Sequence, residues 1–256
     1  MTERSRARSF VAAARTRTRA SRGAILVIAI GLVALCPAAA SAAPVNRASD
    51  RAALNAYHAY LQSLVSLAPS WRQDDNAYVA SISGRCGGVL RPLKGIPTSS
   101  LNAQAVSAFF AEAGGDLDAA SVYPSARPAL GRLAASLGPL RWSSAGIRKV
   151  VSDFVGAERR LQAVGTSNLC ADAHVLASSH GRDISHGTAA FVAKFAHRVV
   201  AAGDAATAFL SVLARYATPT DHGLISSTDH LLQQFASRIK ALAVPEAKKL
   251  VVALGV

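Results

Sequence analysis

The chain is 256 residues long and carries a formal net charge of +13 at pH 7. This length is enough for one sizeable hydrophobic core or for two small ones. The basic residues are spread along the chain and form no tail-like run of five or six after the N-terminal segment, which argues against a nucleic-acid-binding tail.

The N-terminal segment has the three parts of a Sec-type signal peptide. Seven arginines opposed by one glutamate precede an unbroken apolar run over residues 24–35, and small residues follow over 38–43. Because Ala40-Ser41-Ala42 fits the A-x-A rule, we expect cleavage after Ala42. The chain is thereby divided into a signal peptide, 1–42, and an exported helical domain, 43–256.

The N-terminal segment has two alternatives to a cleaved signal peptide. The uncharged stretch Gly23–Val45 is long enough to span a bilayer and to stay as an anchor, but Pro37 and the weakly apolar residues after it argue against this. A lipoprotein signal needs a small residue before its cysteine, and Cys36 follows the large Leu35. We therefore expect a secreted, periplasmic or cell-envelope protein, with membrane attachment only if the leader is kept.

Helical periodicity runs through the first half of the exported domain. We expect one helix over 49–67 that Pro69 ends, and a second helix that Ser70 opens with a capping box and Gly84 closes. A third helix is expected to stop at Gly114-Gly115, and a brief fourth helix follows it.

The second half is helical as well. Ser143 is expected to cap a helix over 143–164, and Ser167 to cap the next one. A long helix is predicted over 185–216, and Asp221 is placed to cap another. Since no alternating strand pattern appears, the predicted fold class is all-α, a single bundle of about seven to eight helices.

Cysteine use agrees with export. Cys36 leaves with the leader, so Cys86 and Cys170 remain as a pair in an oxidising compartment. Such a pair most simply forms one disulfide, the alternative being two separate buried thiols. Neither cysteine lies in a C-x-x-C motif, so redox catalysis is not expected. The bridge would favour one bundle over two independent domains.

Histidines are the residues that best suggest a ligand site. His174, His180 and His186 lie close together along the chain, and His222 begins the helix that follows the long one. If those helices pack together, the imidazoles would converge, and imidazole suits zinc, copper, nickel and haem iron. Because the spacing matches no sharp metal motif, surface or capping residues are the competing interpretation, and no cofactor is otherwise expected.

A second candidate site is a broad basic face on the predicted 143–164 helix. The four cations that share this face are Arg148, Lys149, Arg159 and Arg160. Such a face could bind an anionic envelope polymer or another envelope protein. Asp153 and Glu158 interrupt it, so an ordinary solvated helix face is the alternative.

No coherent catalytic set emerges. Ser237-x-x-Lys240 has the spacing of penicillin-binding enzymes but lacks the other elements that they need, and we interpret it as a coincidence. Asp74-Asp75 suits the first turn of a helix, where the helix dipole favours negative charge. The tyrosines and other aromatics lie at helical spacing and are interpreted as core.

These observations predict an exported, non-catalytic helical protein of the cell envelope or medium that acts as a binding or interaction module. The alternative is a histidine-ligated metal- or haem-binding protein. Nucleic acid is not an expected partner of an exported protein, despite the basic composition.

Overall fold

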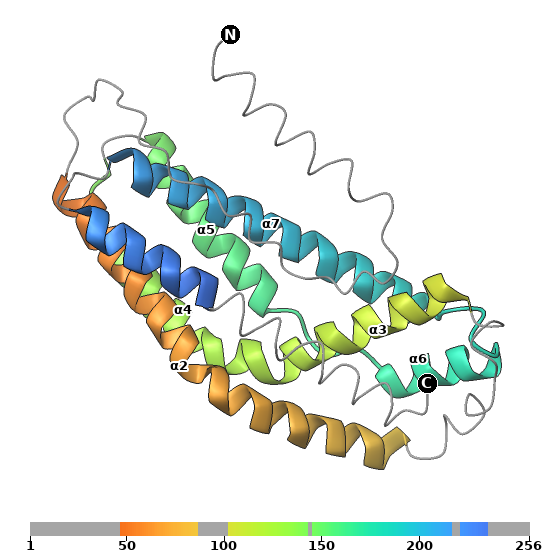
Figure 1. The fold of residues 1–256 in the computed structure, drawn as a ribbon. Helices are drawn as coiled ribbons and strands as arrows, with labels where there is room; N and C mark the ends of the chain where they lie inside the picture. The colour runs from red at the N-terminus through yellow and green to blue at the C-terminus, as the bar shows by residue number, and fades with distance from the viewer. Residues whose placement is uncertain (1–46, 87–101, 143–144, 217–220, 235–256) are drawn as a thin grey trace, which may run out of the picture.

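The computed structural model describes residues 47–86, 102–142, 145–216 and 221–234 (Figure 1). Within these ranges the chain is helical and contains no strand, which confirms the all-α prediction. The named elements are α2 (Arg47–Cys86), α3 (Ala103–Leu117), the π-helical turn η4 (Asp118–Val122), α4 (Tyr123–Leu137), α5 (Ala145–Gln162), α6 (Leu169–Ser178) and α7 (His186–Tyr216). A further helical stretch covers 222–234.

Within the described ranges there are thus six named α-helices, one π turn and the stretch 222–234, against the seven to eight helices predicted for the whole domain. None of the described helices is both long enough and apolar enough to cross a membrane. The predicted signal peptide, 1–42, and the predicted cap Ser143 lie outside the described residues.

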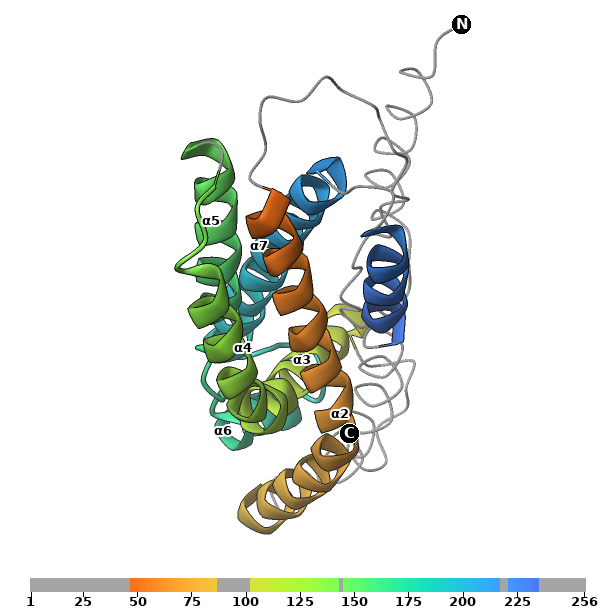
Figure 2. The same ribbon diagram turned by 90° about the vertical axis from the view of Figure 1, so that its left-hand side faces the viewer.

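Helices α2, α4, α5 and α7 run lengthwise beside one another, and α3 and α6 lie at one end of them (Figures 1 and 2). The most extensive packing joins α5 to α7 and α2 to α4. Their shared core is built around the buried rings of Tyr57, Trp71, Phe154 and Phe209. Phe154 and Phe209 stack with ring centroids 4.7 Å apart, and Tyr57 meets both edge-on.

The predicted break at Pro69 is wrong, because α2 continues through it as one helix of 40 residues. An internal proline removes one backbone hydrogen bond and costs about 3 kcal/mol. Here the residues on either side, Ala68 and Trp71, are buried in the core, and Trp71 Nε1 donates to Ser125 Oγ over 2.6 Å. Packing against α4 therefore holds the helix together across Pro69. Ser70 does not cap a helix, since its hydroxyl donates back to the carbonyl of Leu67.

The predicted stop at Gly114-Gly115 is also wrong. The chain stays helical from α3 through η4 into α4. Gly115 instead permits a close approach of α3 to α7, because a Cβ there would lie 2.8 Å from Phe191 Cε1 and 3.2 Å from Phe195 Cδ1. A Cβ on Gly114 would meet nothing within 4 Å.

This contrast gives a matched pair of variants. Gly115→Ala is expected to lower the free energy of unfolding by about 1–3 kcal/mol, because the added methyl displaces two packed rings. Gly114→Ala is expected to raise it by about 0.5–1 kcal/mol, since alanine is the better helix former and the site is open. Urea unfolding of both variants measures the difference. If both variants changed the free energy of unfolding equally and with the same sign, this would contradict the close approach of α3 to α7 at Gly115.

The later helices follow the prediction more closely. The backbone N–H of Thr188 donates to Ser185 Oγ over 2.8 Å, so Ser185 caps α7, and the long helix predicted over 185–216 is confirmed. Helix α6 begins one residue later than expected, with Asn168 as its N-terminal flanking residue. Ser167 turns its N–H to Asp116 instead.

The predicted disulfide is confirmed. Cys86 at the end of α2 is joined to Cys170 in α6, with their Cα atoms 5.2 Å apart. Cys86 is buried in a second core that α2, α3 and α6 share, together with Ile82, Phe109 and Leu176. The bridge therefore fixes the far end of α2 to the two short helices.

Candidate functional site: a cavity inside the bundle

The histidines predicted as metal ligands are all exposed, and the structure does not gather them. His174 lies in α6 and His180 just after its end, near the second core. His222 lies at the opposite end of α2, because the preceding residue, Asp221, pairs with Arg51 there (Figure 1). Within the described ranges, no group of three or more His, Cys, Asp or Glu side chains is placed to hold a metal ion. His186 is the first residue of α7.

His180 has a structural role instead. Its φ of 55° places it in the left-handed region, and the following Gly181 has a φ of 74°. The N–H of His180 donates to Ala177 and that of Gly181 to Leu176, which is the Schellman pattern of a helix end. His180 therefore terminates α6, in line with the capping interpretation.

The predicted basic face is divided by the structure. Arg148 and Arg159 line one groove of about 360 Å³, together with Trp142, and none of the described residues that line it is acidic. Lys149 instead pairs with Asp153 over 2.6 Å on the same helix. Arg160 is exposed and does not line the groove.

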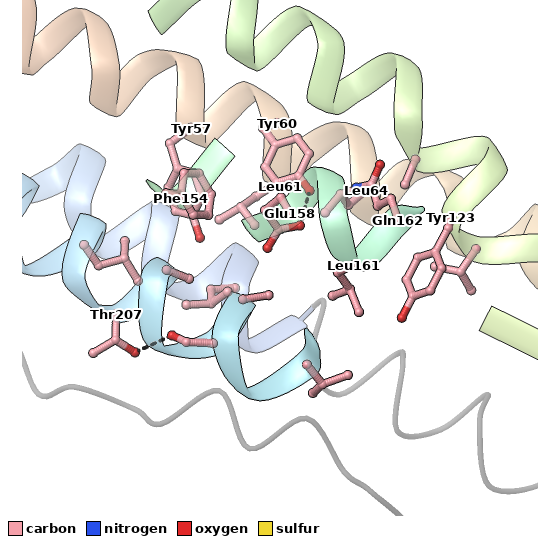
Figure 3. A pocket seen from close by; sticks show the side chains of 18 of the residues that line it. Tyr57, Tyr60, Leu61, Leu64, Tyr123, Phe154, Glu158, Leu161, Gln162 and Thr207 are labelled. Carbon is pink, nitrogen blue, oxygen red and sulfur yellow. Dashed lines mark hydrogen bonds between the residues drawn. The ribbon is translucent and has the colours of Figure 1, made fainter. Parts of the chain in front are cut away.

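A cavity of about 100 Å³ lies in the middle of the bundle, between α2, η4, α4, α5 and α7 (Figure 3). Most of its wall is hydrocarbon. The residues that line it are Tyr57, Tyr60, Leu61, Leu64, Asp118, Val122, Tyr123, Ala126, Phe154, Glu158, Leu161, Gln162, Val199, Ala202, Gly203, Ala206, Thr207, Leu210 and Leu232. An apolar cavity with a few polar groups is the usual form of a small-molecule site.

Helical spacing explains why these residues meet. Tyr57, Leu61 and Leu64 repeat at intervals of four and three on α2, so they share one face of that helix. Phe154, Glu158 and Leu161 repeat in the same way on α5. A polar residue, Glu158, thus occupies a position in a stripe that is otherwise apolar.

Glu158 is the central polar group of the cavity. The hydroxyl of Tyr60 donates to Glu158 Oε2 over 3.4 Å, and Figure 3 shows the two side chains pointing toward one another from facing helices. Burial raises the pKa of Glu158 to about 7, and the hydrogen bond from Tyr60 only partly offsets this. The carboxyl group is therefore close to half ionised at neutral pH.

Asp118 supplies a second carboxyl group to the same cavity. Burial, and next the charge of Asp75, raise the pKa of Asp118 to about 7. Asp118 is the first residue of η4, and such single π turns are frequent at functional sites because they re-aim side chains within a helix.

Two buried polar atoms of the lining lack a hydrogen-bond partner within the described part of the protein. They are the hydroxyl of Tyr123 and Oε1 of Gln162, whose residues are 6% and 4% exposed. An unpaired buried polar group costs about 1–3 kcal/mol, and folded proteins leave few of them. Both atoms belong to residues of the cavity wall.

A separate cluster of buried acids lies outside this cavity, where α2, α3, α6 and α7 meet. Thr188 Oγ1 donates to Glu112 Oε2 over 2.7 Å, and Tyr78 Oη donates to Asp116 Oδ2 over 2.5 Å. Asp172 is within hydrogen-bonding reach of Glu112. Burial, and next the proximity of Asp172, raise the pKa of Glu112 to about 8. These contacts join helices, and we assign the cluster a structural role.

Sequence reasoning did not find the cavity residues. Glu158 was interpreted as an interruption of a basic face, and the tyrosines as core. The available signal was a lone acid in register with the apolar stripe of α5, between Phe154 and Leu161.

Comparison with family models, with curated proteins and with solved structures found no match to this chain.

Proposed function

We propose that this protein is a non-catalytic binding protein of the cell envelope or medium that holds a small, mainly apolar ligand in the bundle cavity. One observation carries the proposal: an apolar cavity is lined by Tyr123 and Gln162, and each of these residues has a buried polar atom without a partner in the described chain. A ligand with an apolar body and a polar group would cover the hydrocarbon wall and satisfy these atoms. The export part of the proposal comes from the N-terminal sequence.

Among the described residues of the cavity, no serine, threonine or cysteine is paired with a base, which favours binding over catalysis. The lining offers carboxyl, phenol and amide groups, while its one aliphatic hydroxyl, Thr207 Oγ1, donates to the carbonyl of Gly203 over 2.9 Å. A hydroxyl committed to its own helix is not activated for attack.

Filling the cavity tests the proposal. Ala206→Phe on α7 places a ring in the cavity, whereas Ala208→Phe places the same ring on the exposed face of that helix. We expect the protein and the Ala208→Phe control to bind small apolar probes such as n-hexanol or n-hexylamine in calorimetric titrations. Ala206→Phe should lower the affinity at least tenfold. Failure of the unmodified protein to bind any probe, or equal binding by both variants, would contradict the cavity as a site.

A second interaction is favoured by the groove on α5. We propose that Arg148 and Arg159, which line it with Trp142, bind an anionic envelope polymer. In titrations with polyglutamate, the unmodified protein should show a salt-sensitive interaction. The double change Arg148→Ala and Arg159→Ala should abolish this interaction. The control Arg132→Ala, at an exposed position on α4, should retain it. Equal binding by both would contradict it.

A further inference from the structure

We propose that the ligand of the bundle cavity is a small apolar amine, bound as its ammonium cation against Glu158 and Asp118. This inference rests on the proposed function and names the chemical class of the ligand. The hydrocarbon part of the amine would lie along the apolar wall that α7 supplies.

The charge of the cavity is the first argument. Its described lining residues include two acids, Glu158 and Asp118, and no lysine, arginine or histidine. The other side-chain polar groups of this described lining are the hydroxyls of the tyrosines and of Thr207 and the amide of Gln162, which brings one N–H₂ donor and the unpartnered acceptor Oε1. An ammonium group carries three donors and no acceptor, so it complements this set, whereas a carboxylate or phosphate would be repelled by it.

The aromatic rings are the second argument. Tyr57, Tyr60, Tyr123 and Phe154 all line the cavity, on three of the helices that enclose it (Figure 3). Aromatic rings attract cations to their faces, and this attraction is larger where water is excluded. The same rings also receive a hydrocarbon chain, so they suit both parts of an apolar amine.

The size and shape of the cavity limit the ligand. A dry cavity of roughly 150 Å³ accepts benzene, and this cavity of about 100 Å³ is smaller but not fully enclosed. The wall from α7 consists of Val199, Ala202, Gly203, Ala206 and Leu210, with Thr207 bonded to its own helix. An unbranched alkylamine matches this narrow apolar wall better than a fused-ring molecule.

Protonation of Glu158 adds a pH dependence. Its pKa of about 7 in the free protein means that a proton competes with the ammonium group below neutral pH. The other titratable groups that face it from the surrounding elements are Tyr57 and Tyr60 on α2, Asp118 on η4 and Tyr123 on α4; α7 and Leu232 contribute none to the described lining. Asp118, with its pKa also about 7, titrates in the same direction.

Calorimetric titration of the protein with n-hexylamine and with n-hexanol, at pH 8 and at pH 5.5, tests the inference. At pH 8 hexylamine should bind at least tenfold more tightly than hexanol. Between pH 8 and pH 5.5 the affinity for hexylamine should fall roughly 10- to 30-fold, because a group of pKa about 7 is then almost fully protonated. The affinity for hexanol should stay nearly constant.

The double change Glu158→Gln and Asp118→Asn should reduce the affinity for hexylamine to that for hexanol and remove most of the pH dependence. Asp153→Asn, an exposed change one turn earlier on α5, should leave both affinities unchanged. A readout that needs no variant is proton release, measured from the binding heat in two buffers of different ionisation enthalpy at pH 6.5. Hexylamine should release protons on binding, and hexanol should not.

The outcomes separate the two proposals. Equal affinities for hexylamine and hexanol, or hexylamine binding without proton release, would overturn the amine inference and leave the cavity as an apolar binding site. Binding of neither probe would overturn the proposed function and the amine inference together.

Discussion

Loss of the Cys86–Cys170 disulfide is expected to lower the free energy of unfolding by about 4–5 kcal/mol. The bridge joins residues 84 positions apart, and closing a loop of that length removes much of the conformational freedom of the unfolded chain. Cys86 is also buried beside Ile82 and Phe109, so the end of α2 would lose its covalent link to α6 in the middle of the second core.

Urea unfolding of the oxidised protein, the reduced protein and the double variant Cys86→Ala, Cys170→Ala measures this effect. With a slope of about 2–3 kcal/mol per molar urea, the midpoint should fall by about 2 M. The same treatment with reductant should leave the double variant unchanged, which controls for any effect of the reductant itself. A midpoint shift below 0.3 M would show that the second core holds α2 and α6 together without the bridge.

The protein is expected to become less stable as the pH rises from about 5 to about 8, the reverse of ordinary acid denaturation. The pKa of Glu112 is about 8 in the fold and about 4.3 in an unfolded chain. Between these values the folded state holds a proton that the unfolded state releases, so the free energy of unfolding falls with rising pH. The contribution of protonated Glu112 to the free energy of unfolding is complete below about pH 4.5 and lost above about pH 8.

The magnitude follows from burial. Glu112 is 0% exposed, so its charge is poorly screened. The free energy of unfolding is therefore expected to fall by on the order of 3 kcal/mol between about pH 5 and about pH 8. Glu158 and Asp118 shift in the same direction but are half-buried and contribute less.

Glu112→Gln isolates this effect. The amide keeps an acceptor for Thr188 and supplies a donor toward Asp172, without a titrating proton. We expect the variant to match the wild-type protein at pH 5, to exceed its stability at pH 8.5 by on the order of 3 kcal/mol, and to show a flatter pH profile. Asp153→Asn, at an exposed position, should follow the wild-type profile. A wild-type stability that rises from pH 5 to pH 8 would exclude a protonated Glu112.

Elements with a strong local pattern were predictable from the sequence. The predicted long helix over 185–216 has its serine cap, and the pairing of Cys86 with Cys170 was predicted by assigning the third cysteine to the expected leader. The helix prediction depends on residues that are close together in the sequence. The disulfide prediction depends on the even number of cysteines after the expected leader.

The errors arise where tertiary packing overrides local preference. Pro69 was expected to break the chain, but Trp71 and Ala68 are held in the core on either side of it. Asp75 was assigned to a first turn, yet it lies buried inside α2 and accepts a hydrogen bond from Ser121. No local pattern shows which distant hydroxyl will meet such an acid.

The cavity was not predictable for a related reason. Its polar groups come from α2, η4, α4 and α5, and each one alone looks like an ordinary core or surface residue. Only the assembled bundle reveals that Glu158 faces Tyr60 rather than solvent.

The π turn η4 behaves as a one-residue insertion within a continuous helical run from Ala103 to Leu137. Each α-helical residue turns the chain by about 100°. A residue added to a segment that stayed α-helical would therefore turn everything after it by that angle and carry Leu130, Leu133 and Leu137 away from the core. A π turn holds one residue more than an α turn, so η4 absorbs the extra residue and leaves α3 and α4 nearly in phase. The wide turn is thus the form in which this helical run accommodates an extra residue without moving the faces on either side of it.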